Sequence, residues 1–486
     1  ARPLAMVRVV VRSIAGDVFE LEVDAHCQVG SLKESISTAW HVPSSCQRLA
    51  LGRAVLHDAE SLATCCSGDC VSLTMVVSVD HLVKDLESGQ FQRQSEALVE
   101  LEKLGVKGGI DVVNAVSACL EDDDANVRRA AVQALAHVVP KGDCHAIDGV
   151  CLRLAHQTAA VRQTAVEALG QVAARGDKHA CTEVGRYFAH KNWEVRRAAV
   201  QALASVVEGG DLEAVRALCC RLEDVSWDVR QDAIKAIAQV AQRGDQQTVA
   251  AVCSRLAHAK SQVRQSAVVA LGRIAEENDE YAIPAVIAHL DHADWGVRLT
   301  AVEAVAQIAE RGTQNAIVAV CARIGDESWE VRQAALDALP AVAEKDDQYV
   351  VDNLCTHLQH HSWEVRFTVA GVLPQLVSRG NQRIVASICA CLSDRDSRVK
   401  FTALKALADV AKKGDQGPIQ AVIACVEDGD WEVRQAAVEA LVDMAEEDDH
   451  HAKGAVSSRL GDEDLRVKFA AAQALAVMEM RSGHFM

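Results

Sequence analysis

The chain has 486 residues, of which half are hydrophobic and 24% are charged, so it can bury a core and is not expected to be disordered. It carries 68 Asp and Glu against 50 Lys and Arg, and the net charge of −18 argues against general attraction to nucleic acid or anionic membranes. No stretch reaches the roughly 20 apolar residues of a membrane-spanning helix. We expect a soluble, cytoplasmic protein, although the chain begins with Ala and a preceding segment, an organelle or the nucleus stays open.

Residues 6–78 alternate between apolar and polar positions in a way that is typical of strands. Val7, Val9 and Val11 form one such run, and a turn at residues 15–17 separates it from the next, which indicates a β-hairpin. A helical stretch at residues 31–40 and further strand-like runs follow. The order β-β-α-β-β predicts a small α+β domain.

The sequence of this segment resembles a ubiquitin-like (β-grasp) domain. The resemblance rests on Gln47-Arg48-Leu49, the turn at residues 52–56 and the closing run at residues 72–76. It implies a docking module whose recognition surface would draw on Ile14 and Ala50. Because the chain continues past Ser78 without a terminal Gly-Gly, we do not expect a conjugated modifier.

Beyond residue 110 a Val-Arg or Val-Lys pair recurs every 34 residues without insertion or deletion, which indicates a repeat architecture. Apolar residues follow each such Val at helical spacing, a Gly, Asn or Asp suited to a left-handed turn comes about 15 positions later, and a second helix follows. Each unit is therefore a helical hairpin that must stack on its neighbours to bury its apolar face. The repeated valines are Val127, Val161, Val195, Val229, Val263, Val297, Val331, Val365, Val399, Val433 and Val467.

The run from Trp431 to Leu441 and its near-copy from Trp329 resemble the HEAT-type repeat, in the short form named after phycobilisome lyases. The fold class expected is mainly α: a right-handed α-α superhelical HEAT-like solenoid of about eleven repeats after the ubiquitin-like domain. The resemblance implies that the first helix of each unit, counted from the Val-Arg helix, lies on the convex side and the second on the concave side. The expected limits are 6–78, 79–110 for a degenerate capping repeat, 111–480 for the solenoid and 481–486 for a tail.

Five positions before each repeated Val stands either Asp or His, one per unit, which does not make converging ligands. We expect a structural ladder between Asp and the repeated Arg, within or between units, and weaker joints where His replaces Asp. Its members include Asp224, Arg230, Asp326, Arg332, Asp428 and Arg434.

Cysteine and tryptophan also occupy fixed repeat positions. Cys151, Cys219, Cys253, Cys321, Cys355 and Cys389 recur at spacings of about 10 Å or more, too far apart for disulfides, and are expected to be buried thiols. Six Trp stand at the start of the Val-Arg helices and are expected to pack against the next hairpin. The local cluster Cys65-Cys66-x-x-x-Cys70 lacks a second pair, so we expect no metal and no cofactor.

A column of cations near the end of the second helices, beside small residues one turn earlier, suggests a positive groove. We predict that it binds an acidic protein segment on the concave side; the alternative is that each cation pairs within the solenoid. The column comprises Arg153, Arg221, Arg255, His289, Arg323, His357 and Arg459.

The sequence shows no phosphate loop, nucleophile elbow or helical His pair, and we expect no catalytic residues. The favoured function is a non-enzymatic scaffold that binds a protein on its concave face and docks another through the ubiquitin-like domain, a role that would suit a component of a larger complex. A bilin-lyase-like or assembly-factor role, with a chromophore or apoprotein in the groove, is the alternative. Nucleic acid is not an expected partner.

Overall fold

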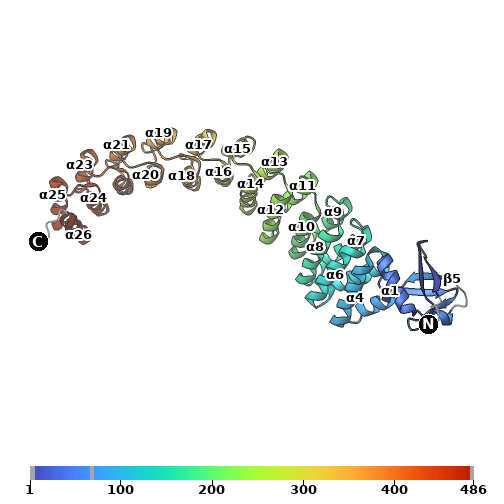
Figure 1. Cartoon of the computed structure of the whole chain (residues 1–486). Helices are drawn as coiled ribbons and strands as arrows, with labels where there is room; N and C mark the ends of the chain where they lie inside the picture. The colour runs from blue at the N-terminus through green and yellow to red at the C-terminus, as the bar shows by residue number, and fades with distance from the viewer. Residues whose placement is uncertain (1–5, 66–69, 482–486) are drawn as a thin grey trace. The chain divides into compact units, whose positions relative to one another are not determined.

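The computed structural model describes residues 6–65 and 70–481, and the chain forms two compact units, Ala1–Val240 and Ala241–Met486. The N-terminal unit combines a small sheet with helical hairpins, and the C-terminal unit consists of helical hairpins (Figure 1). No described helix is long and apolar enough to cross a membrane.

The N-terminal sheet has the strand order β2-β1-β5-β3-β4, with β1 and β5 parallel and the other pairs antiparallel. Leu32 and Ile36 of helix α1 are fully buried, as are apolar side chains of the sheet such as Val9 and Leu73. This mixed five-stranded sheet with its helix fits a β-grasp-like domain. Its elements are β1 (Met6–Ser13), β2 (Val18–Asp24), α1 (Val29–Trp40), β3 (Gln47–Leu51), β4 (Ala54–Val55), α2 (Leu62–Cys65) and β5 (Cys70–Val77).

Two helices, α3 (Asp80–Leu86) and α4 (Phe91–Leu104), connect the sheet to the first full hairpin. On α4, Gln94 stands where later repeats have Arg, and its side-chain amide donates to the carboxylate of Asp122 at 2.8 Å. The segment therefore carries a neutral residue at the position of the repeated Arg.

Paired helices fill the rest of both units, and the even-numbered helix of each pair contains the repeated Val. The N-terminal unit holds α5 (Gly109–Ala118), α6 (Ala125–Val138), α7 (Cys144–Leu152), α8 (Ala159–Val172), α9 (Lys178–Gly185), α10 (Trp193–Val206), α11 (Leu212–Arg221) and α12 (Trp227–Val240). The C-terminal unit holds α13 (Gln246–Cys253), α14 (Ser261–Ile274), α15 (Ala282–Ile287), α16 (Trp295–Ile308), α17 (Gln314–Cys321), α18 (Trp329–Val342), α19 (Gln348–His357), α20 (Trp363–Leu376), α21 (Gln382–Cys391), α22 (Ser397–Val410), α23 (Gln416–Cys425), α24 (Trp431–Met444), α25 (His450–Ser458) and α26 (Leu465–Arg481).

The turns between an even-numbered helix and the next odd-numbered helix follow the predicted chemistry. Gly244 has a φ of 71°, in the left-handed region that favours glycine, and Asp245 then caps α13 by accepting from the backbone N–H of Thr248. The N–H of Gly244 also donates to the carbonyl oxygen of Ile274 in the next repeat at 2.9 Å. Because this bond recurs along the chain, each turn also connects neighbouring repeats.

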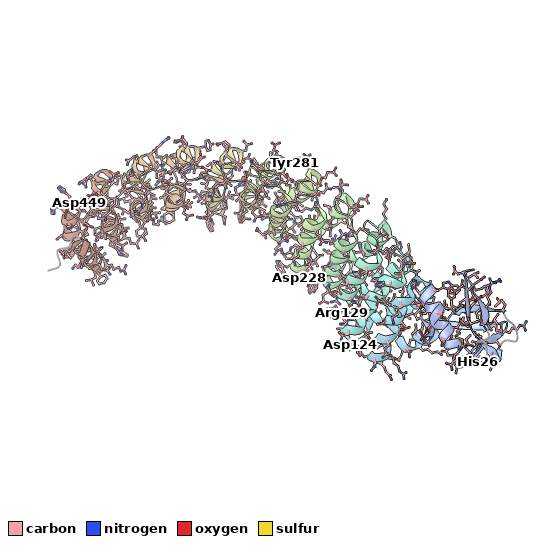
Figure 2. All side chains as sticks on the ribbon, viewed as in Figure 1. His26, Asp124, Arg129, Asp228, Tyr281 and Asp449 are labelled. Atoms are coloured by element: carbon pink, nitrogen blue, oxygen red, sulfur yellow. The ribbon has the colours of Figure 1, made fainter. Side chains whose placement is uncertain are left out.

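The expected placement of the two helix layers is wrong for residues 241–486. Figure 1 shows the even-numbered helices of this unit on the inner side of its curve and the odd-numbered helices on the outer side. Tyr281 and Asp449, next to the starts of α15 and α25, accordingly lie on the outer side in Figure 2. Buried alanines such as Ala301 and Ala304 let adjacent even-numbered helices approach closely, and the more closely spaced layer lies inside the curve.

Candidate protein-interaction surfaces

The joints between repeats are held by ion pairs that connect one repeat to the next. Arg298 donates two hydrogen bonds to the carboxylate of Asp326, from Nε at 2.8 Å and from Nη2 at 2.7 Å. The side chain of Asp326 is only 3% exposed. The same residue positions pair along the chain, always 28 residues apart. The pairs are Arg196–Asp224, Arg298–Asp326, Arg366–Asp394, Lys400–Asp428 and Arg434–Asp462.

Within its own repeat, the arginine at this position donates a hydrogen bond to a backbone carbonyl oxygen. Arg332 donates from Nη1 to the carbonyl oxygen of Asp326 at 2.8 Å, and Arg230 and Arg434 do the same to Asp224 and Asp428. The predicted ladder thus has two parts: a carboxylate bond between repeats and a carbonyl bond within each repeat.

The carboxylates of the ladder are held in their charged form. Burial alone would raise the pKa of Asp326, but the hydrogen bonds from Arg298 and from the N–H of Ser328 bring this pKa below its ordinary value. The pKa of Asp224 is lowered against burial in the same way, by Arg196 and the N–H of Ser226.

Where His replaces Asp, the imidazole ring accepts the backbone hydrogen bond of the loop but does not provide a carboxylate for the arginine of the preceding repeat. Nδ1 of His292 accepts from the backbone N–H of Asp294 at 3.0 Å, just as Oδ1 of Asp326 accepts from Ser328 at 3.0 Å. The arginine of the preceding repeat then has to find another partner. Arg162 and Arg332 reach Glu194 and Glu364 on the next even-numbered helix.

The predicted cation column lies at the same edge as the ladder, at or just after the ends of odd-numbered helices. Its members turn back onto the solenoid: Arg323 donates to the carbonyl oxygen of Leu290 at 3.0 Å and pairs with Asp291 at 3.1 Å. Arg221 donates to the carbonyl oxygen of Phe188, and Arg153 pairs with Glu121.

The remaining members bond locally. They are Arg255 with the carbonyl oxygen of Ala251, His289 with that of Ala285, His357 with that of Asn353, and Arg459 with Asp462. In the C-terminal unit these residues belong to the odd-numbered helices or directly follow them, so the expected concave location of the column is wrong there.

The inner layer instead presents tryptophans at the starts of the even-numbered helices. Trp295 and Trp329 are 47% and 64% exposed, and Trp193 and Trp227 in the N-terminal unit are exposed too, so the expectation that such side chains pack against the next hairpin is wrong for these four. Trp363 is half-buried and lies edge-on to Phe367, one helical turn further on, with ring centroids 6.2 Å apart. The exposed rings of Trp295 and Trp329 are therefore accessible to a partner.

Two clusters bring groups of metal-ligating type together in space or in sequence. Asp148, His179 and Glu183 bring ligand atoms within 4.8 Å of one another, but Nε2 of His179 is bonded to Asp148 at 2.7 Å and Glu183 pairs with Arg186. Of the predicted cluster at Cys65, Cys66 and Cys70, Cys66 and the side chain of Cys65 lie outside the described residues, and Cys70 is exposed.

The predicted thiol column is mostly buried. Burial raises the pKa of Cys151, Cys253 and Cys321 to about 12, which leaves these thiols protonated and unreactive. Cys219 and Cys355 are also buried and Cys389 is half-buried, and all six are free thiols.

In the β-grasp-like region, the two predicted surface residues occupy different settings. Ile14 is 74% exposed in the turn between β1 and β2, whereas Ala50 is half-buried in β3 opposite Thr74 of β5.

These hairpins and their joints define an α-solenoid of short repeats, and comparison with known proteins names the family. A family model described as HEAT repeats matches overlapping ranges between residues 147 and 476, and the chain belongs to this family. A second model, a HEAT repeat associated with sister chromatid cohesion, matches residues 109–135. No curated protein matches.

The matched HEAT ranges all begin in an odd-numbered helix and end in an even-numbered one, which explains the wrong layer assignment. The Val-Arg helix is therefore the second helix of each pair, and not the first as expected from the sequence. The ranges are 147–238, 215–306, 249–340, 317–408, 351–442 and 385–476.

The solved structures that resemble this chain share little sequence identity with it and align with low TM-scores. A crystal structure of an engineered protein aligns with 82% of this chain and 98% of its own at 20% identity and a TM-score of 0.31. A chain from a structure of Kap95p with RanGDP aligns over 83% of this chain and 61% of its own at 13% identity and a TM-score of 0.44.

Sequence reasoning missed two features of these surfaces. One is the exposure of Trp295 and Trp329; the usable signal was that Trp363 and Trp431 have an arginine, Arg398 and Arg466, at the position where the next repeat covers the ring, whereas Trp295 and Trp329 have Glu there. The 28-residue offset of the ladder had no such signal, because it follows from how the repeats stack.

Proposed function

We propose that this protein is a non-enzymatic scaffold that binds a protein partner on the inner layer of even-numbered helices. The observation that supports the proposal most is the exposure of Trp295 and Trp329 on that layer. Large aromatic side chains, Trp above all, contribute most of the binding energy at many protein interfaces. The charged groups of the joints, in contrast, are engaged within the solenoid.

The N-terminal region, residues 6–78, would serve as a second, ubiquitin-like docking module. Its polar contacts with α3 and α4 include Ser45 with Glu100 at 3.1 Å and Arg48 with Asp80 at 3.5 Å, both exposed. Because such contacts stabilise little, we expect residues 79–486 to keep their helical circular dichroism when residues 1–78 are deleted. Loss of that signal would show that the two parts fold as one and would contradict the proposed limits 6–78, 79–110, 111–480 and 481–486.

The scaffold proposal is tested by capturing partners with the full chain and locating them by cross-linking and mass spectrometry. Cross-links should concentrate on even-numbered helices and fall when Trp295 and Trp329 are both replaced by Ala. The matched comparison is the triple variant R221A/R255A/R323A, which removes three cations of the column and leaves both tryptophans in place. Loss of capture in this triple variant alone would instead support the predicted acidic partner on the column, and visible absorbance of the purified protein would support the chromophore alternative.

A further inference from the structure

Two tryptophans of the inner layer are covered by an arginine that the next repeat supplies. Cζ of Arg398 lies 3.5 Å from the ring centroid of Trp363, and Cζ of Arg466 lies 4.3 Å from that of Trp431. Both distances are well inside the range of about 6 Å within which a cation is attracted to an aromatic face. Arg398 is further held by Asp396 at 2.9 Å. The repeat therefore has a built-in geometry for stacking a guanidinium on this Trp.

Trp295 and Trp329 occupy the same helix position in two consecutive repeats, but no cation covers them among the described residues. The residue that corresponds to Arg398 is Glu330 for Trp295 and Glu364 for Trp329. An acidic side chain cannot stack on the negative face of an indole, so the rings remain exposed at 47% and 64%.

The surroundings of these rings carry negative charge that is only partly matched. Glu330 is bonded to the hydroxyl of Ser328, and Glu364 pairs with Arg332. A cation arriving at these rings would meet an aromatic face and the acidic side chain at the corresponding position, Glu330 for Trp295 and Glu364 for Trp329.

We propose that Trp295 and Trp329 are two adjacent sites for arginine or lysine side chains of a basic protein segment. This inference deepens the proposed function, on which it rests, by naming the chemistry of the partner. The partner's cations take the place that Arg398 and Arg466 hold in the last repeats. Repeats stack about 10 Å apart and an extended chain advances about 3.3 Å per residue, so cations about three residues apart reach both rings.

The probe is a synthetic 15-residue peptide of repeated Arg-Ser-Ser, compared with the same peptide carrying neutral citrulline in place of arginine. Binding to the full chain is followed by titration calorimetry. We expect the arginine peptide to bind and the citrulline peptide to bind at least tenfold more weakly. Replacing Trp295 and Trp329 together by Ala should weaken the arginine peptide about five- to twentyfold.

Because an acidic protein attracts basic peptides generally, a matched pair of charge variants is needed. Glu330→Arg places an arginine where Arg398 stands relative to Trp363, and it should cover Trp295 and weaken peptide binding. Glu432→Arg changes the same helix position by the same charge, but the preceding repeat has Ser397 instead of Trp. E432R should therefore reduce binding clearly less than E330R.

Equal effects of E330R and E432R, unchanged affinity in W295A/W329A, or no binding of the arginine peptide would each overturn the inference. Circular dichroism of each variant checks that the fold is kept. If the native partner cross-links to the even-numbered helices while these peptide results are negative, the scaffold proposal stands and only the basic partner is wrong.

Discussion

Two kinds of joint connect neighbouring repeats, and the C-terminal unit has one of each side by side. At the first, Arg298 meets the carboxylate of Asp326 with two charge-assisted hydrogen bonds. At the second, the next repeat offers His292, and Arg264 is left with its own loop carbonyls and a hydrogen bond from Nε to Thr300 Oγ1 at 3.3 Å. Arg264 has no ion pair among the residues that the structure describes.

The comparison separates two tasks that a single Asp performs. Asp326 and His292 both accept the N–H of the residue two positions on, so both shape the loop before the next helix. Only Asp also neutralises the arginine of the preceding repeat. The sequence alternation between Asp and His therefore changes how strongly adjacent repeats are coupled, while it leaves each hairpin's loop intact.

Removing the carboxylate should have the largest effect. Asp326→Ala leaves Arg298 charged and nearly buried without its partner, and it also removes the loop acceptor, for a loss of about 3 kcal/mol. His292→Ala removes one neutral hydrogen bond and should cost about 1 kcal/mol. Urea unfolding, with hydrogen exchange of α16 and α18 as a local measure, compares the two variants.

The control for this pair is Asp291→Ala, which removes an exposed partner of Arg323 and should change stability by less than about 0.5 kcal/mol. Equal losses in D326A and H292A would show that the loop bond, and not the ion pair, holds the joint.

Converting the weak joint into the strong kind should stabilise the unit. His292→Asp keeps an acceptor for the N–H of Asp294 and gives Arg264 a carboxylate at the position that Asp326 holds relative to Arg298. We expect a gain of about 1 to 2 kcal/mol in the same unfolding assay. His292→Asn, which keeps an acceptor without charge, should leave stability unchanged, and a gain in this variant too would remove the ion pair as the cause.

A smaller, pH-dependent effect is expected at the joint of His360. Burial, the rings of His361 and His357, and the cations Arg332 and Arg366 lower the pKa of His360 below its ordinary value. As pH falls below about 6.5, the unfolded chain takes up this proton before the folded chain does, so stability falls with acidification. The ring must also stay unprotonated at Nδ1 to accept from the N–H of Ser362.

The measurement is the melting temperature of the protein between pH 7.5 and 5.5. His360→Asn cannot take up this proton, and its melting temperature should fall less over that range than that of the wild type. An identical fall in both proteins would place the pH dependence elsewhere.

The features that depend only on neighbouring residues in the chain could be predicted from the sequence. The period of 34, the left-handed turn at Gly244 and the cap at Asp245 follow from residue type and spacing, and the structure confirms them. The partner of each ladder Asp did not follow, because Arg298 and Asp326 meet only after two hairpins have stacked. The layer that faces inward was also mispredicted, since the sequence does not say where one repeat ends and the next begins.

The smallest effect expected is that of a reductant on the melting temperature. It distinguishes the ion pairs of the joints from the cysteine thiols as the source of stability. The six cysteines of the column are as regular as the ladder, but they recur at repeat spacings of about 10 Å or more, beyond the roughly 7 Å that a disulfide allows between Cα atoms. They are free thiols, and burial keeps Cys253 and Cys321 protonated. We therefore expect the melting temperature to stay within about 1 °C when dithiothreitol is added, in the wild type and in D326A alike. A fall of several degrees would mean that covalent bonds, and not the ion pairs and apolar contacts between repeats, hold the solenoid together.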